Sequence, residues 1–213
     1  ANTSALSISG MTLTNGKTTS VYGGGAVQSY YSGKLSLDHV VIKNSTAAGP
    51  GGGLMFSDAT GDLIVKNSTI DGNSVTDVGA NGAGGGLSVF AQDVTISNST
   101  ISNNTTAGFY GGGGALSGSS SIVITNTTVA GNSAGNAGVA SGGGGGLSIS
   151  NGATIVNTTI ANNAWVGGNS VNNGGGGLSV FNTSSNSVLT NNIIANNTST
   201  NSNFSDNDVI VTH

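Results

Sequence analysis

The chain has 213 residues, of which 6% are charged, and its formal net charge at pH 7 is −4. Arginine and glutamate are absent, and the four cations are all lysines. Because phosphate binding needs clustered basic side chains, this balance excludes a nucleic-acid partner. Cysteine is also absent, which excludes disulfides and thiolate metal sites. No apolar stretch is long enough to span a bilayer, so we expect no direct membrane insertion by this segment.

One pattern starts near Leu6 and repeats along the chain as far as Asn197. Each copy has a run of glycines, an aliphatic segment that alternates with Ser, Thr or Asn, and a phrase of the type Asn-Ser-Thr-Ile. The glycine runs are Gly23–Gly25, Gly51–Gly53, Gly84–Gly86, Gly111–Gly114, Gly142–Gly146 and Gly174–Gly177. Repetition at a period of about 30 residues predicts a solenoid.

Aligning the copies on the Asn of the phrase produces two aliphatic columns. The column two residues before this Asn is Ile8, Ile42, Val65, Ile96, Ile124, Ile155 and Leu189. The column three residues after it is Leu13, Ala47, Ile70, Ile101, Val129, Ile160 and Ile194. Since apolar residues recur with the strand period of two, each copy supplies three short strands. We predict an all-β, single-stranded parallel β-helix of about seven turns, in which residues 1–213 form one domain and a segment of a longer protein.

The bends between these strands explain the polar columns. Asn and Gly tolerate the left-handed backbone of a sharp turn. The predicted ladder of stacked turn residues is Asn44, Asn67, Asn98, Asn126, Asn157 and Asn191, with Gly10 in the first copy. A second column, six residues later, is Asn73, Asn104, Asn132, Asn163 and Asn197, with Gly16 and Pro50 in the first two copies.

The glycine-run and Asn-x-x-Ile-x-x-Asn phrases resemble the right-handed β-helix repeats of bacterial surface proteins. They are similar to the polymorphic outer-membrane-protein type and, more distantly, to the pectate-lyase-like superfamily. The resemblance covers roughly Leu6 to Asn197 and implies a right-handed coil, but it does not specify an activity. It implies an extracellular or cell-surface location.

Variable loops between the second Asn column and the next glycine run carry aromatic residues. These are Phe109, Tyr110 and Trp165, and Tyr22 precedes a glycine run in the same way. On the polar, Asn-rich surface formed by these loops, such rings could stack on the sugars of a glycan. The alternative, which we favour, is that they pack over neighbouring glycines and shield the core.

A column of polar residues lies five positions before the turn Asn. In the predicted alignment it brings His39, Asp62 and Asp93 together on successive turns. This line could bind calcium or zinc or form an acid–base pair, although solvated strand-start residues are the simpler interpretation. Lys43 and Lys66 also stack in this alignment, so Asp62, Asp93, His39 and Lys66 are the catalytic candidates of an enzyme.

Two functions remain open. The first is a non-enzymatic structural or adhesive module of a bacterial surface protein or fibre, which contacts a glycan or cell surface and associates end to end. It needs no cofactor. The second is a polysaccharide lyase or hydrolase, which would use calcium. Because enzymes of this fold usually carry more charge, we prefer the first.

Overall fold

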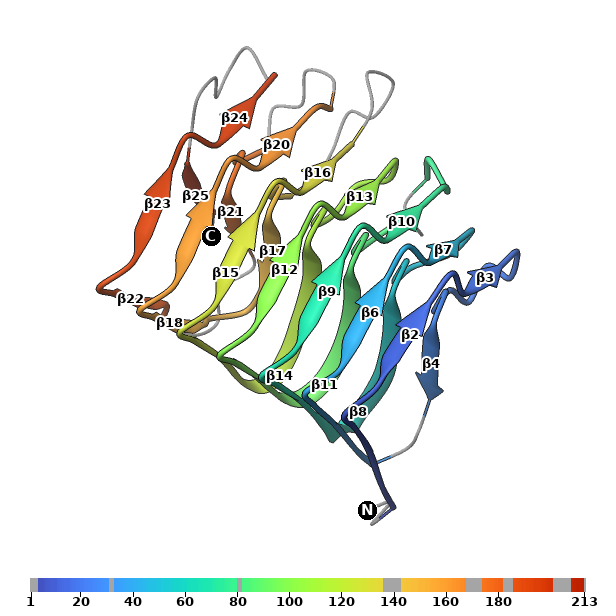
Figure 1. The fold of residues 1–213 in the computed structure, drawn as a ribbon. Coiled ribbons are helices and arrows are strands. Elements are labelled where there is room, and N and C mark those ends of the chain that lie inside the picture. Colours follow the sequence, from blue (N-terminus) through green and yellow to red (C-terminus); the bar gives the residue numbers. More distant parts are fainter. Residues whose placement is uncertain are drawn as a thin grey trace.

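The protein is a parallel β-solenoid. A computed structural model describes residues 4–30, 33–79, 82–135, 143–167, 174–181, 186–200 and 208–212. The described residues form 25 strands and no helix, and the strands pair in parallel within three sheets (Figure 1). The all-β prediction is therefore confirmed.

The first sheet contains the longest strands. Its members are β1 (Ala5–Ser9), β4 (Val27–Tyr30), β5 (Lys34–Asp38), β8 (Leu54–Lys66), β11 (Leu87–Ser97), β14 (Gly114–Thr125), β17 (Leu147–Ser150), β18 (Thr154–Val156), β21 (Leu178–Phe181), β22 (Val188–Thr190) and β25 (Val209–Thr212). Where β8, β11 and β14 bend, the pairing register shifts.

The second and third sheets consist of short strands, one from each turn. The second sheet contains β2 (Thr12–Thr14), β6 (Val41–Lys43), β9 (Thr69–Asp71), β12 (Thr100–Ser102), β15 (Thr128–Ala130), β19 (Thr159–Ala161) and β23 (Ile193–Ala195). The third contains β3 (Lys17–Thr18), β7 (Thr46–Ala47), β10 (Ser74–Val75), β13 (Thr105–Thr106), β16 (Ser133–Ala134), β20 (Ala164–Trp165) and β24 (Thr198–Ser199).

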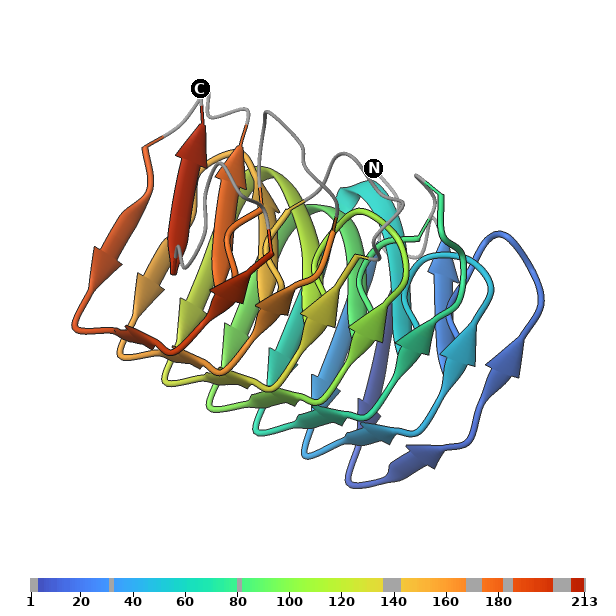
Figure 2. The same cartoon turned by 90° about the horizontal axis from the view of Figure 1, so that it is seen from above.

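Successive coils stack along one axis (Figure 2). The second sheet has seven strands, so the chain completes six circuits between β2 and β23. The solenoid therefore has about six turns, slightly fewer than the seven predicted. Inward-facing aliphatic residues of all turns form one continuous core, in which Leu63, Ile96 and Ile124 are fully buried.

Two corners of each turn require a left-handed backbone. The first corner joins the first sheet to the second, and its residues have φ between 49° and 65°: Gly10, His39, Asn67, Asn98, Asn126, Asn157 and Asn191. The second corner joins the second sheet to the third, with φ between 53° and 66°: Asn15, Asn44, Gly72, Asn103, Gly131, Asn162 and Asn196. Asn and Gly recur here because other residues strain in this conformation.

The predicted alignment of the second turn was wrong by one corner. His39 occupies the first corner, where its N–H donates to the Lys66 carbonyl at 3.2 Å. Asn44 occupies the second corner instead, and Ile42 pairs with Ile70 rather than lying next to Val65. Both corners accept the same residue types. The sequence Asn44-Ser45-Thr46 at the second corner is therefore identical to the Asn-Ser-Thr that begins the repeated phrase at the first corner.

The continuous amide ladder is the second Asn column. Asn73, Asn104, Asn132 and Asn163 are at most 1% exposed. Each Oδ1 accepts from the backbone N–H of the ladder residue one turn earlier, as in Asn73 N to Asn104 Oδ1 at 2.9 Å. Each Nδ2 donates to the next Oδ1 at 2.9–3.0 Å and to a main-chain carbonyl. Both donors and both acceptor positions of the Asn104, Asn132 and Asn163 amides are thus used.

The predicted first-corner ladder is exposed and interrupted. Asn126 donates to Asn98 at 3.2 Å and Asn191 donates to Asn157 at 2.6 Å, while Asn67 donates to Asp38. These side chains form pairs rather than one chain of hydrogen bonds. The prediction of Pro50 in the Asn73 column was also wrong. In the second turn this column continues through Ser45, which donates its N–H to Asn73 Oδ1.

Candidate functional site

A trough lies on the outer face of the first sheet, across β11, β14, β17 and β21. Strand alternation directs Leu87 and Val89 into the core and their neighbours outward. The pairing register therefore aligns one outward column across the four strands: Phe90, Ser117, Ser150 and Phe181. Two serines thus lie between two phenylalanines, and adjacent strands are about 4.8 Å apart.

The floor of the trough is a pair of hydroxyl groups. Ser150 Oγ lies 2.9 Å from Ser117 Oγ. Tyr110 covers one side, and its ring stacks on Phe181 with a centroid separation of 5.7 Å and an interplanar angle of 25°. Phe90, whose exposed fraction is 46%, lies next to Ser117 on the adjoining strand. The trough therefore combines aromatic walls with a hydroxyl floor.

The trough is open to solvent and has a volume of about 270 Å³. Its lining consists of uncharged side chains, namely Ser88, Val89, Tyr110, Ala115, Leu116, Ser117, Ser148, Ser150 and Phe181. Ser148 is 2% exposed, and its Oγ has no hydrogen-bond partner within the described part of the chain. Since a buried hydroxyl without a partner costs free energy, this group is suited to a hydrogen bond with a bound molecule.

Backbone hydrogen bonds fix the segment that supplies Tyr110. The Tyr110 carbonyl accepts from Gly84 N at 2.8 Å, and the Phe109 carbonyl accepts from Gly143 N at 2.8 Å. Gly111 then turns the chain with φ 57°, where a Cβ would collide with the Gly114 carbonyl. The glycine run thus allows Tyr110 to lie flat against the next turns.

The four aromatic residues predicted as ligand contacts lie in different environments. Tyr110 lines the trough, as the glycan interpretation requires. Trp165 is fully buried and packs with Ala134 and Phe109, so its prediction as a surface ligand contact was wrong. Tyr22 is 65% exposed and lies edge-on to Tyr30 in the first turns, away from the trough. The shielding role therefore holds for Trp165 and Phe109.

The corrected register separates the charged candidates. Lys34, not His39, pairs with Asp62, which in turn pairs with Asp93. Lys43 lies opposite Asp71 rather than Lys66. The predicted His39–Asp62–Asp93 line was therefore wrong at His39, whose place depended on the second-turn alignment, whereas Asp62 and Asp93 pair as predicted. Among the described residues, no group of three or more His, Cys, Asp or Glu side chains could hold a metal ion.

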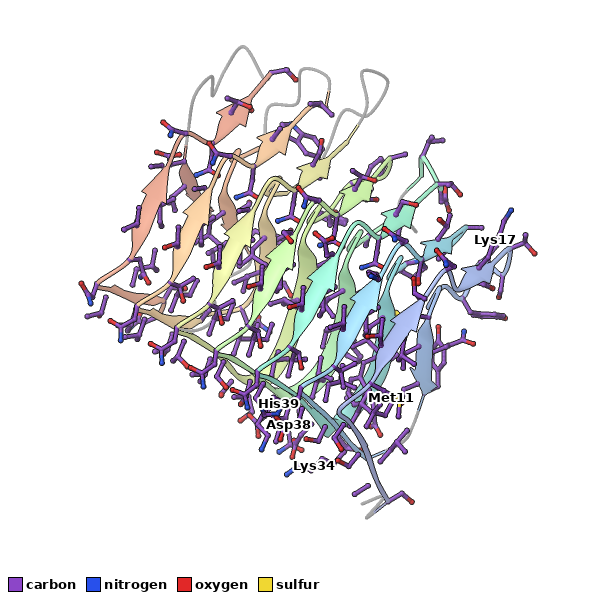
Figure 3. All side chains as sticks on the ribbon, viewed as in Figure 1. Met11, Lys17, Lys34, Asp38 and His39 are labelled. Carbon is purple, nitrogen blue, oxygen red and sulfur yellow. The ribbon has the colours of Figure 1, made fainter. Side chains whose placement is uncertain are left out.

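His39 belongs to a separate polar cluster at the first corner, where Figure 3 labels it beside Asp38. His39 Nδ1 lies 2.7 Å from Asp38 Oδ1, and Lys66 Nζ lies 3.4 Å from Asp38 Oδ2. The hydrogen bond from Asn67, together with the Lys66 contact, lowers the pKa of the Asp38 carboxyl. The side chain of His39 is 70% exposed, so this cluster is a solvated surface feature.

Phe90, Phe181 and the four serines of the trough were not predicted from the sequence. One signal could have found them: the phrase Leu-Ser-Val-Phe occurs twice, at Leu87–Phe90 and Leu178–Phe181. In a strand that starts with an inward Leu, the fourth residue faces outward. An outward Phe in these two copies departs from the Ser that three other copies carry there, at Ser57, Ser117 and Ser150.

Comparison with known proteins identifies the family. The family described as "Right handed beta helix region" matches residues 1–213, so the chain belongs to it. No curated protein and no solved structure matches the chain. Within the described residues, no helix has the length and apolar character needed to cross a membrane.

Proposed function

We propose that this β-helix is a non-enzymatic, adhesive module that binds a neutral carbohydrate in the trough. The carrying observation is the buried Ser148 hydroxyl, which has no partner in the described residues and lines a cavity walled by Tyr110 and Phe181. Ligand sites typically pair an apolar wall with a few oriented polar groups. Aromatic faces attract the polarised C–H groups of a sugar ring, while serine hydroxyls hydrogen-bond its hydroxyls.

The size and charge of the trough define the ligand class. A volume of about 270 Å³ lies just below the usual range for drug-sized ligands, so it suits one sugar ring of a longer glycan. Uncharged lining residues favour a neutral sugar over a uronic acid. The trough is open along the outward column, so the rest of the glycan can continue past Phe90.

An extracellular or cell-surface location is part of the proposal. It is supported by the similarity of the repeat phrases to those of bacterial surface β-helices, and a glycan ligand fits such a location. Surface labelling of cells that produce the full-length protein tests it. Label on intact cells supports an external location, whereas label that appears only after lysis contradicts it.

The enzyme alternative has weaker support. A hydrolase or lyase needs an acid and a base close to one scissile bond. Here His39 and Lys66 cluster with Asp38 at the corner, whereas Asp62 and Asp93 lie on the outer face of the first sheet beside Lys34. The catalytic candidates are thus split between two places, and neither lines the trough.

Glycan binding is tested on an array of neutral and acidic oligosaccharides, followed by calorimetry. We expect Tyr110→Ala and Phe181→Ala to weaken binding of the best neutral glycan about tenfold each, which corresponds to about 1.4 kcal/mol. Glycan binding by both variants that is as strong as that of the wild type would contradict the proposal.

Two serines provide a matched pair for this test. Ser148 and Ser179 are both buried, both lack a hydroxyl partner in the described residues, and they pair on neighbouring strands. Only Ser148 appears in the cavity lining. We expect Ser148→Ala to reduce glycan affinity severalfold without lowering the melting temperature, whereas Ser179→Ala leaves affinity unchanged. Equal effects of the two variants would contradict a role of the Ser148 hydroxyl in binding.

A further inference from the structure

A second hollow lies beside the trough, at the bend of the first sheet, and we call it the side pocket. It has a volume of about 130 Å³ and is open to solvent. It lies where β14 pairs with β18, beside β22, and these three strands are neighbours in Figure 1. The described residues that line it are uncharged, as in the trough, and include Ser120, Ser121, Thr154 and Asn186. The side pocket is therefore a polar space about half as large as the trough.

A difference in length between two neighbouring turns creates the side pocket. Ser117 pairs with Ser150 before the bend, and Val123 pairs with Thr154 after it. Six positions of β14 thus lie opposite four positions of the next turn, so β14 contains two extra residues at the bend. Such bulges redirect side chains and are frequent next to binding sites. Ser120, at this bulge, is exposed and lines the side pocket.

A glycine leaves the side pocket unfilled. Ser121 lies two positions before Val123 in β14. Gly152 lies two positions before Thr154, the partner of Val123 on the next turn. Gly152 therefore continues the outward column of Ser121 but has no side chain. The hydroxyls of Ser121 and Thr154 border the space that remains, and each can both donate and accept a hydrogen bond.

The neighbouring charges determine which groups can enter. Asp93 pairs with Ser121, so its carboxylate is one strand step of about 4.8 Å from the side pocket. Asp62 pairs with Asp93 on the strand beyond, and Lys34 lies on the far side of both acids. Two carboxylates on the near side repel an anion. The side pocket is thus suited to a neutral group with hydroxyls rather than to a uronic acid or a sulfate.

The side pocket and the trough share a short stretch of backbone. Ser150 lines the trough and Gly152 lines the side pocket, so their Cα atoms are at most about 7 Å apart. Two hydrogen bonds hold Asn151 between them: its Nδ2 donates to the Gly118 carbonyl at 2.9 Å, and its N–H donates to the Phe181 carbonyl at 3.2 Å. The turn between the two spaces is therefore fixed, and a group attached to a sugar in the trough can reach the side pocket.

We propose that the side pocket binds a neutral side branch of the glycan whose main-chain sugar lies in the trough. This inference rests on the proposed function, because the trough must first hold a sugar ring. With about half the volume assigned to that ring, the side pocket takes the outer edge of a single branching sugar. The main chain continues past Phe90, along the axis of the solenoid, while the branch crosses the bend. The protein therefore selects branched over linear neutral glycans.

Matched pairs of neutral oligosaccharides test this selectivity on an array, followed by calorimetry on the best pair. The pairs include mannopentaose with and without one galactosyl branch, and cellotetraose with and without one xylosyl branch. We expect the wild type to bind the branched member of its best pair about tenfold more tightly. Equal affinity for both members of every bound pair would overturn this inference and leave the proposed function intact. Binding of no glycan at all would overturn both.

Two side-pocket variants and one control locate the effect. Ser121→Phe fills the side pocket from an exposed strand position that tolerates an aromatic residue, and Thr154→Ala removes one hydroxyl. We expect Ser121→Phe to lose the preference for the branched glycan, and Thr154→Ala to reduce it severalfold, while both bind the linear glycan as the wild type does. Tyr110→Ala should weaken binding of both glycans.

Thr125→Ala is the matched control, because Thr125 also lies on β14 but lines neither the trough nor the side pocket. It should keep the full preference for the branched glycan. Melting temperatures confirm that each variant is folded. A folded Ser121→Phe variant that still prefers the branched glycan would overturn the inference, as would an equal loss of preference in Thr125→Ala.

Discussion

Asparagine has two separate roles in this chain, and burial distinguishes them. At the first corner the residue is selected for its backbone, because φ is near +50° and the side chain points into solvent. In the ladder it is selected for its amide, which satisfies its own donors and acceptor and also a backbone N–H one turn away. Substitutions at the two kinds of position should therefore have different costs.

Removal of one ladder amide should be severely destabilising. Asn104→Ala leaves the backbone N–H and the Nδ2 of Asn73 without their acceptor, and both are buried. At about 1–3 kcal/mol for each unsatisfied donor, we expect a loss of about 3 kcal/mol in the free energy of unfolding. Urea denaturation measures it. Asn98→Gly, at an exposed corner, is the control and should change stability little; equal losses in both variants would count against the ladder.

Two variants of His39 test the corrected second turn, because the corrected and the predicted alignments give opposite orders of stability for Gly and Ala at this position. At φ 54°, Gly is tolerated while Ala is strained by about 1 kcal/mol. His39→Gly should therefore be more stable than His39→Ala in thermal melts. In a regular strand, as the sequence alignment predicted, Gly would instead be the less stable of the two by about 0.5–1 kcal/mol. The opposite order would restore that alignment.

Aliphatic columns were predictable at the residue scale because strand alternation determines them, and Ile70, Ile101 and Ile160 stack as expected. The second turn was not, because His39 occupies a corner at which the other turns have Asn or Gly. Trp165 was also unpredictable, since its burial depends on Ala134 and Phe109 from two other turns. Sequence spacing contains no information on such loop packing.

At the scale of a strand, the bend in β8 depends on one carboxylate. Asp58 is 4% exposed, and it accepts hydrogen bonds from Gly33 N at 2.9 Å, Thr60 N at 3.0 Å and Thr60 Oγ at 2.9 Å. These bonds connect the bend of one turn to the start of β5 in the turn before. Hydrogen bonds from the Thr60 and Gly33 main chains lower the pKa of Asp58 below its ordinary value of 3.8.

This lowered pKa predicts how stability depends on pH. The ionised Asp58 stabilises the folded state fully above pH 3.8, and the contribution disappears as the pH falls through the lower folded-state pKa. Asp58→Asn should therefore melt below the wild type at pH 7, with a gap that narrows at acid pH. Ser88→Ala changes no ionisable group, so its gap should stay constant. A gap for Asp58→Asn that does not change between pH 7 and pH 2 would refute the role of this carboxylate.

The three strands of each turn could be predicted from the repeat, but the trough could not. It requires the outward positions of β11, β14, β17 and β21 to align, together with a loop residue that reaches across two turns. Tyr110 could be named as a candidate because it departs from the repeat. Its partner Phe181 could not, because only the pairing register brings the two rings together.

At the scale of the whole molecule, repetition separates scaffold from function. The core, corners and ladder recur in nearly every turn, so they account for stability and set the spacing of the strands. The trough does not recur, and the proposed function lies there. The fold was predictable from the sequence because it is periodic, whereas the site was not because it arises from exceptions to the period.

A crystal structure of the chain with its best-binding neutral oligosaccharide tests the central claim most directly. We predict one sugar ring above Ser117 and Ser150, against the Tyr110 ring, with a sugar hydroxyl within hydrogen-bonding distance of Ser148 Oγ. A sugar bound instead along Lys34, Asp62 and Asp93, with the trough empty, would contradict the account and favour an enzyme.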